Sequence, residues 1–361
     1  MKDYYENPGL LLPEENITGQ IGWRSPSNIA LVKYWGKYGR QLPKNASLSM
    51  TLSKAYTETS LKYRTATAAP KRVFLFEGND HPAFAKRIWK FVDSLEHIFP
   101  YLQQMDLEID TKNSFPHSAG IASSASAMSA LALCLVDMER QIFHLGYSDA
   151  EFFKKASYIA RLGSGSASRS IYPGFSLWGH AKKVSIDSDN KFAIPFYDAI
   201  HPSFRGLRDA ILIVDDAQKK VSSSMGHSLM NHHPYADDRL AQADRNLNLL
   251  DKALRVGDKQ VFINVVESEA LSLHALMMTS DPWFMLMKAE SMSIIQKIKK
   301  YREHSGKFIT FTMDAGPNVH VLYSEEDQLD IHSFIDKELK PLCVKQQLLY
   351  DEMGRGPIKL K

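Results

Sequence analysis

The sequence predicts an α+β protein built from two domains. Its 361 residues exceed what one compact core usually contains. Apolar residues make up 44% and charged residues 24%, which is ordinary globular composition. Strand-like and helix-like stretches mix without a regular β–α–β alternation, and this favours an α+β arrangement over a doubly wound parallel sheet.

The first half of the chain is expected to form an N-terminal extension and one domain. Residues 1–20 are predicted to be an irregular extension, and the first domain is expected over 21–205. Residues 45–66 alternate polar and apolar side chains, as a half-buried strand or hairpin does. Residues 125–136 are apolar almost all round and predict a buried helix.

The second domain is expected over 206–361. The pattern resets near residues 203–210, where "RDAILIVDD" indicates a strongly apolar strand. Further elements are predicted in chain order: long helices near 236–256, 258–277 and 282–303, a hairpin over 307–323, a helix near 326–338 and a last strand near 344–350.

Composition excludes several classes of function. The net charge of +3 is too weak to indicate a nucleic-acid partner. Acidic residues stand near the N-terminus where a signal peptide would be apolar, so a cytoplasmic location is expected. No apolar stretch is judged long enough to span a membrane. With only two cysteines, Cys134 and Cys343, no disulfide framework or cysteine-rich metal site is expected.

Two small-residue turns could bind phosphate groups. Gly120, Ser123 and Ser124 precede the predicted buried helix, whose first turn would expose backbone N–H groups. This is not a Walker loop, because the Gly-Lys-Ser/Thr is missing. Ser123 could equally be a simple N-cap.

The second turn is "GSGS" at residues 163–166, with Arg169 shortly after it. An arginine beside such a turn can hold a carboxylate or phosphate with two parallel hydrogen bonds. Taken alone, a helix C-cap followed by a solvated arginine is the simpler interpretation.

Two further motifs carry charge. Lys33, Tyr34 and Lys37 are spaced so that an extended segment could present them to one ligand, although surface lysines are common. Asp314 opens the turn "DAGPN", which is also an ordinary β-turn sequence. Together with the two small-residue turns, these residues supply the donors, cations and carboxylate that phosphoryl transfer requires.

Three histidines near residue 230 also suggest a metal site. His227, His232 and His233 lack the companion ligands that zinc prefers, so no metal site built by a protein motif is expected.

The motifs, taken in order, resemble the GHMP superfamily of small-molecule kinases. The similar stretches include "NIALVKYWGK", "FPHSAGIASSAS", "RLGSGSASRSIYPGF", "ESEALSLHALM" and "MDAGPNVHV", and they span residues 21 to 357. "KYWGK", "GSGSASRS" and "MDAGPN" together resemble the mevalonate diphosphate decarboxylase family. The resemblance implies a ribosomal-protein-S5-like N-terminal domain and a ferredoxin-like C-terminal domain, with the active-site cleft between them.

The resemblance also implies a reaction. It is the ATP-dependent decarboxylation of mevalonate 5-diphosphate to isopentenyl diphosphate, with Mg²⁺ accompanying ATP. The family is usually homodimeric, and neither nucleic acid nor membrane is implied as a partner. Alternatives on the same scaffold are a decarboxylase of mevalonate 5-phosphate and a mevalonate-type kinase that stops at the phosphorylated product.

Residue roles follow from the resemblance by position. Asp314 is the expected catalytic acidic residue, Lys33 stands near it, and Arg169 holds the substrate carboxylate. The residues expected to bind the substrate diphosphate are Tyr34, Lys37, Ser164, Gly165 and Ser166. The residues expected in the loop around the ATP phosphates are Gly120, Ser123 and Ser124.

The chain departs from the family pattern at a few places. Tyr38-Gly39 replaces the usual Arg-Asp after Lys37, and the other departures are His117, Ser168 and His227. Tyr38-Gly39 lies beside Lys37, which is expected to bind the diphosphate, and a change there can alter the pocket. Diphosphate specificity is therefore the part of the prediction that most needs a test.

Overall fold

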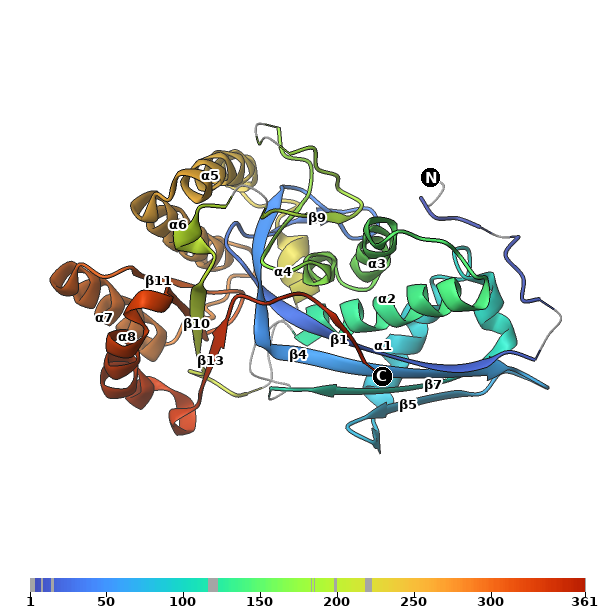
Figure 1. Ribbon diagram of the computed structural model, residues 1–361. Coiled ribbons are helices and arrows are strands. Elements are labelled where there is room, and N and C mark those ends of the chain that lie inside the picture. Colours follow the sequence, from blue (N-terminus) through green and yellow to red (C-terminus); the bar gives the residue numbers. More distant parts are fainter. Residues whose placement is uncertain are drawn as a thin grey trace.

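The computed structural model describes residues 4–7, 9–13, 16–115, 123–182, 184, 186–197, 200–217 and 223–360. A larger sheet with helices α1–α3 forms one part of the molecule, and a smaller sheet with helices α5–α8 forms the other (Figure 1). The α+β class predicted from the sequence is therefore confirmed.

The larger sheet has eight strands and is almost wholly antiparallel. Its main path is β14-β1-β4-β7-β5-β6, with β8 pairing with β4 and β9 pairing with β8. Only the β5–β7 pair is parallel within this sheet. Its strands are β1 (Thr18–Ala30), β4 (Ser47–Thr65), β5 (Arg72–Phe76), β6 (Asn79–Asp80), β7 (Met105–Asn113), β8 (Phe175–Trp178), β9 (Ala193–Pro195) and β14 (Ile358–Leu360). A separate ribbon pairs β2 (Lys37–Tyr38) with β3 (Leu42–Pro43).

Strand β4 explains the long alternation in residues 45–66. Its first residues, Ser47–Met50, pair with β8, and its later residues, 57–65, pair with β7. Over residues 57–65, exposed or half-buried positions alternate with buried ones, as expected for a strand with one face on the core. One strand thus extends from the N-terminal core to the region that holds the active-site motifs.

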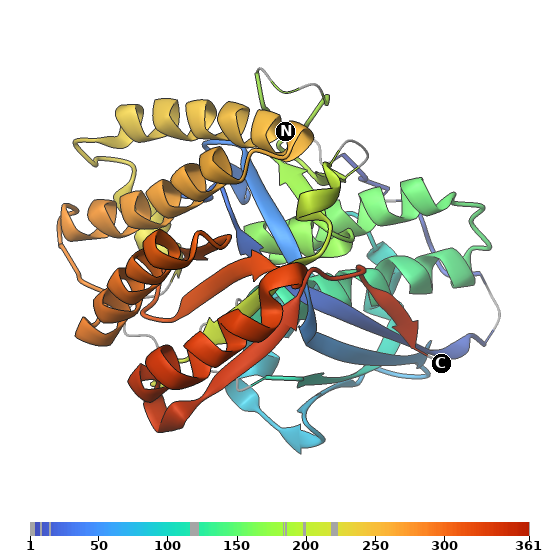
Figure 2. The same ribbon diagram turned by 60° about the vertical axis from the view of Figure 1, so that its left-hand side comes forward.

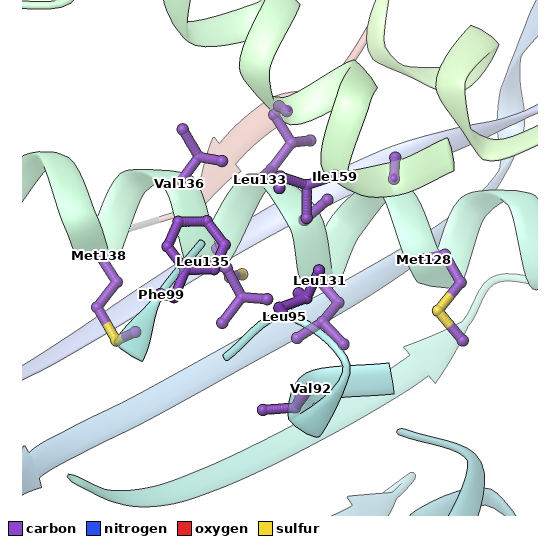
Figure 3. Close-up of a cluster of buried hydrophobic side chains, with 14 of the residues drawn as sticks. Val92, Leu95, Phe99, Met128, Leu131, Leu133, Leu135, Val136, Met138 and Ile159 are labelled. Carbon is purple, nitrogen blue, oxygen red and sulfur yellow. The ribbon is translucent and has the colours of Figure 1, made fainter. Parts of the chain in front are cut away.

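Helices α1 (Pro82–Asp93), α2 (Ser123–Ile142) and α3 (Asp149–Gly163) build the core of this part. In Figure 3, Leu133 and Val136 of α2 point toward α3, whereas Leu131 and Leu135 point toward the chain around Leu95. Because α2 is covered on both sides, the prediction of a buried helix is confirmed. A capping box formed by Ser148 and Glu151 fixes the start of α3.

The smaller sheet has four strands in the order β11-β12-β10-β13, all antiparallel. Helices α6, α7 and α8 pack against it, and α5 runs beside α6 (Figure 2). The elements of this part are α4 (Ser223–Leu229), α5 (Ala236–Val256), α6 (Lys259–Met278), α7 (Ala289–Ser305), α8 (Gln328–Phe334), β10 (Leu207–Leu212), β11 (Ile309–Thr312), β12 (Val319–Ser324) and β13 (Leu348–Glu352). Shorter 3-10 and π-helical segments complete the described elements: η1 (Pro100–Gln104), η2 (Gly165–Ile171), η3 (Pro202–Phe204), η4 (Glu325–Asp327), η5 (Ile335–Leu339), η6 (Lys340–Leu342) and η7 (Val344–Gln346).

The third long helix was predicted to begin at residue 282, and this start is wrong. Helix α7 begins at Ala289. The preceding segment instead folds back on α6, where the Phe284 N–H donates to the Met277 carbonyl at 3.0 Å. Phe284 also packs in a cluster with Trp35 and Met230. Tertiary packing therefore overrides the helical spacing of these residues.

Both ends of the chain return to the larger sheet. Strand β14 pairs with β1, with Gly22 opposite Leu360 (Figure 1). In the N-terminal extension, Leu10, Leu12 and Ile17 pack against the core of the first part. The C-terminal segment thus joins the two parts, and the division of the chain at residues 205 and 206 stays a prediction.

The expectation that no segment is long and apolar enough to span a membrane is wrong for helix α6. By length and composition Lys259–Met278 is long and apolar enough, but 56% of its most apolar window is buried inside the protein. Its carboxylates Glu267 and Glu269 form ion pairs with Arg302 and Arg239. These features are typical of the core helix of a globular domain.

Candidate active site

The site is centred on an ion pair that joins the two parts of the molecule. The Lys33 ammonium donates to Asp314 Oδ1 at 2.9 Å, across 281 positions of sequence. Lys33 follows β1, and Asp314 opens the turn between β11 and β12. The Lys33 side chain is 2% exposed and that of Asp314 is 32% exposed. The carboxylate therefore remains accessible to a ligand while its partner is buried.

Burial and neighbouring charges act in opposite directions on Lys33. Removal from water lowers the pKa of the ammonium, and the carboxylates of Asp314 and Glu269 partly offset that shift. The ammonium also donates to the Ala30 carbonyl at 2.6 Å. These contacts fix the Nζ atom in one place, from which it can orient the Asp314 carboxylate.

Arg169 lies on η2 and is 3% exposed. One guanidinium nitrogen, Nη1, donates to the Ser47 hydroxyl. The Nε atom is buried and has no hydrogen-bond partner among the described residues. Burial lowers the pKa of Arg169 to about 10, with Asp314 and Tyr34 acting in the other direction. Arg169 is therefore still a cation at neutral pH, with a donor that an anionic ligand can engage.

Tyr34 provides a further buried donor near the site, because its hydroxyl has no partner among the described residues. Its ring packs edge-on against Trp178, with centroids 4.7 Å apart. Burial raises the pKa of its hydroxyl, which therefore stays protonated. A Cβ atom on Gly165 would lie 2.9 Å from this hydroxyl, so only glycine permits the close approach of the turn.

The two serine-containing turns converge, as phosphate binding would require. Ser124 Oγ lies 3.4 Å from Ser164 Oγ, and Ser164 Oγ lies 3.5 Å from Ser166 Oγ. Asn28 of β1 holds this turn by donating to the Ser166 carbonyl at 3.1 Å. Ser123 begins α2, so the first turn of that helix lies beside the cluster. Gly120 lies outside the described residues.

Lys37 lies in β2 and donates to Gln41 Oε1 at 3.1 Å. Burial lowers the pKa of its ammonium. Tyr38, which follows it, is exposed, and its hydroxyl accepts a hydrogen bond from Asn190. Lys37 lies near His227: burial, followed by the positive charges of Lys37 and Arg169, lowers the pKa of that imidazole.

The unusual residues His227 and Ser168 have structural partners. His227 Nδ1 accepts a hydrogen bond from the Gly36 N–H at 3.0 Å. Its ring centroid lies 4.2 Å from that of Tyr34, and burial lowers its pKa to about 3. The imidazole is therefore neutral. Ser168 donates to the Gly165 carbonyl at 2.8 Å and so stabilises the glycine turn. His117 lies outside the described residues.

The sequence analysis predicted no metal site, and the described part of the chain contains no group of three or more His, Cys, Asp or Glu side chains placed to hold an ion. His233 bonds to the Leu276 carbonyl at 3.0 Å.

Sequence analysis missed several residues that contact the site. They are Asn28, Ser47, Arg239, Glu269 and His274. Glu269 and His274 lie in "ESEALSLHALM", one of the stretches that carried the resemblance. A carboxylate within a largely apolar helix was the available signal for Glu269.

The fold and the site together define a class of protein. Two α+β domains meet at a lysine–carboxylate pair, and buried cationic and hydroxyl donors lie beside the start of a helix. That combination is typical of a small-molecule enzyme acting on phosphorylated substrates.

Comparison with known proteins identifies the family. A family model for the "Diphosphomevalonate decarboxylase-like N-terminal domain" matches residues 25–191, and one for the "Mevalonate 5-diphosphate decarboxylase C-terminal domain" matches residues 210–356. Diphosphomevalonate decarboxylase of Danio rerio is 30% identical over 84% of this chain and 76% of its own length.

Solved structures agree with the family models. Mevalonate diphosphate decarboxylase from Staphylococcus aureus superposes with a TM-score of 0.81 at 30% identity, covering 96% of this chain and 99% of that one. A complex of a protein called MDDEF with MVAPP, AMPPCP and magnesium superposes with a TM-score of 0.80 at 27% identity, covering 96% and 100%. The chain belongs to the mevalonate diphosphate decarboxylase family and has its GHMP kinase fold.

Proposed function

We propose that the protein catalyses the ATP-dependent decarboxylation of mevalonate 5-diphosphate. The products are isopentenyl diphosphate, ADP, phosphate and carbon dioxide. The observation that carries this proposal is the Lys33–Asp314 pair at 2.9 Å, next to the buried donors of Arg169 and Tyr34. Membership of the family supports the same reaction.

Asp314 is the group that acts on the tertiary 3-hydroxyl of the substrate. In a loose transition state for phosphoryl transfer, little deprotonation of the attacking hydroxyl is needed early. Asp314 therefore orients the hydroxyl and accepts its proton late. Its charge also stabilises positive character at C3 as phosphate departs. Lys33 holds the carboxylate in place through its contact at 2.9 Å.

Arg169 positions the substrate carboxylate. Tighter binding of the anion in the ground state would oppose its loss as carbon dioxide, because only differential binding accelerates a step. The role of Arg169 is thus placement and substrate choice. The Tyr34 hydroxyl, the Ser164–Ser166 turn and Lys37 supply donors for the diphosphate.

ATP is proposed to bind where α2 begins. Ser123 and Ser124 lie at the first turn of that helix, where N–H groups and the helix dipole favour phosphate. No carboxylate cluster is needed for Mg²⁺, since that ion commonly takes most of its ligands from water and phosphates. Mg²⁺ bound together with ATP would offset the negative charge of the phosphate groups.

The test is a mass balance. The protein is incubated with ATP, Mg²⁺ and either mevalonate 5-diphosphate or mevalonate 5-phosphate, and ADP and carbon dioxide are measured. Equal yields of both from the diphosphate are expected. The same result only with the monophosphate would change the substrate, and ADP without carbon dioxide would mean a kinase and overturn the proposal.

We also propose that the active protein is a cytoplasmic homodimer without nucleic-acid or membrane partners. The low net charge supports the absence of a nucleic-acid partner, and the usual state of the family supports the dimer. Light scattering after size exclusion should give twice the mass of one chain, and a single-chain mass at assay concentrations would contradict the dimer.

A further inference from the structure

Helix α6 contacts the main chain of both members of the central ion pair. Glu269 Oε2 accepts the Lys33 N–H at 2.7 Å. His274, five residues further along the same helix, donates from Nε2 to the Asp314 carbonyl at 3.1 Å. Both side chains are buried, with 0% and 2% exposure. One rigid element therefore holds the backbone on both sides of the pair.

The Glu269 carboxylate is surrounded by donors. Arg239 of α5 binds it with two hydrogen bonds, from Nη1 to Oε1 at 2.8 Å and from Nη2 to Oε2 at 2.5 Å. Asn246 donates to Oε1 at 2.6 Å. Arg239 also reaches the Lys33 carbonyl at 3.4 Å. The N–H and the carbonyl of Lys33 are thus both bound by this buried network.

Such a network is costly as a stabilising device. A buried ion pair often contributes no more to stability than apolar residues of similar volume, because both charges lose their water. The geometry offers a different advantage here. The network joins α5 and α6 to the segment that follows β1, which is where the active-site lysine lies.

We propose that Glu269 is a positioning residue that fixes the Lys33 main chain and provides the negative charge behind the Lys33 ammonium, with His274 holding the Asp314 turn from the same helix. This inference rests on the proposed function for its effect on turnover. It assigns to α6 the role of holding the main chain at Lys33 and Asp314.

The charge has a measurable consequence. Burial lowers the pKa of Lys33, and Glu269 acts against that change. Removal of the Glu269 charge should therefore lower the pKa of Lys33 further, so that the ammonium is lost at a lower pH. The charged groups around Lys33 are Asp314 on the β11–β12 turn, Glu269 on α6, Arg169 on η2, Arg239 on α5 and Asp209 on β10.

The main experiment compares the pH dependence of kcat in the wild type and in Glu269→Gln. The amide retains an acceptor for the Lys33 N–H but has no charge. We expect the alkaline limb of kcat to move down by about one pH unit and kcat at neutral pH to fall about tenfold. The KM for ATP should stay within about twofold, because the network does not lie at the α2 turn.

Glu139→Gln is the matched control. Glu139 is 2% exposed and is paired with Lys155 at 2.6 Å, on helices α2 and α3. It should lose stability without moving the alkaline limb. An unchanged limb and kcat in Glu269→Gln, or an equal shift in Glu139→Gln, would overturn the proposal.

Glu269→Asp provides a second variant should the amide fail to fold. It keeps the charge but withdraws the carboxylate by one methylene group, so kcat should fall while the alkaline limb stays at the wild-type pH. Wild-type kcat in Glu269→Asp would contradict a positioning role.

A readout independent of turnover separates this inference from the proposed function. The titration of Lys33 can be followed by NMR in protein labelled with 15N-lysine, with Lys33→Met providing the assignment. A lower titration midpoint in Glu269→Gln would support the charge role even if the wild type released no carbon dioxide. An unmoved midpoint would refute that role even in an active enzyme.

Discussion

Two buried lysines of this molecule are paired with carboxylates, and the two pairs differ in ways that separate a structural pair from a catalytic one. In the pair between α2 and α3, the Lys155 ammonium contacts both oxygens of Glu139, at 2.7 and 2.6 Å, and the Tyr147 hydroxyl at 3.2 Å. At the junction of the two parts, Lys33 contacts one oxygen of a carboxylate that is 32% exposed.

The surroundings of the two lysines differ as well. The Lys155 ammonium lies among aromatic rings, with those of Tyr5, Phe99 and Tyr147 between 5.2 and 5.5 Å away. Lys33 instead lies near Arg169, whose Nε has no partner among the described residues. Burial of charge alone therefore does not mark a site. The Lys33–Asp314 pair is distinguished by a partly exposed carboxylate and by the nearby cation Arg169, which has an unmatched donor.

The largest expected effect is that of Asp314→Asn. The amide cannot accept the hydroxyl proton or stabilise positive charge, so kcat should fall about a thousandfold. The Asp314 side chain is partly exposed and Glu269 remains near the Lys33 ammonium, so the loss of stability should be smaller than in Glu139→Gln, and nucleotide binding should change little. Steady-state kinetics measure kcat, and calorimetric titration with ATP measures nucleotide binding. Near-normal turnover would remove Asp314 from catalysis.

Glu139→Gln should show the opposite behaviour. It leaves the Lys155 ammonium buried without a countercharge, and the free energy of unfolding should fall by about 3 kcal/mol. The kcat of the folded fraction should not change. Urea denaturation and kinetics on the same samples test this, and a loss of kcat with intact stability would reverse the roles of the two pairs.

Arg169→Gln should impair the use of mevalonate 5-diphosphate more than that of ATP. Loss of a charged donor to the substrate carboxylate should lower kcat/KM for mevalonate 5-diphosphate about thirtyfold. The KM for ATP should move much less, because the nucleotide is proposed to bind at the start of α2. An unchanged KM for mevalonate 5-diphosphate, together with an unchanged rate, would place Arg169 outside the site.

Tyr34→Phe should have the smallest effect. It removes a buried hydroxyl that has no partner among the described residues, so stability should not fall, while the substrate KM should rise about fivefold. Tyr147→Phe is the matched control, because its hydroxyl bonds to Lys155 and Glu139. That control should lose stability with an unchanged KM. Equal changes of stability and of substrate KM in the two variants would contradict the distinction between the Lys33–Asp314 and Lys155–Glu139 regions.

The sequence predicted the parts of the site that depend on local motifs. Asp314, Arg169 and Lys33 were singled out because short stretches around them resemble the family. The structure brings Lys33 and Asp314 together, and the catalytic roles stay predictions. The α+β class and the hairpin around Asp314 followed from periodicity, and β11 and β12 confirm that hairpin.

The parts that could not be predicted depend on contacts between distant residues. Glu269 meets the Lys33 backbone across 236 positions, and no local pattern indicates such a bond. Strand β14 has three residues and is defined only by its pairing with β1. The wrong start of α7 has the same origin, since residues 282–288 have helical spacing but pack against α6 and Trp35.

The most direct test of the account is the yield of ADP and carbon dioxide from mevalonate 5-diphosphate, measured side by side for the wild type and Asp314→Asn. We predict equal yields of the two products in the wild type and a parallel loss of both in the variant. Carbon dioxide release that survives in Asp314→Asn, or ADP formed without carbon dioxide in the wild type, would contradict the central role given to the Lys33–Asp314 pair.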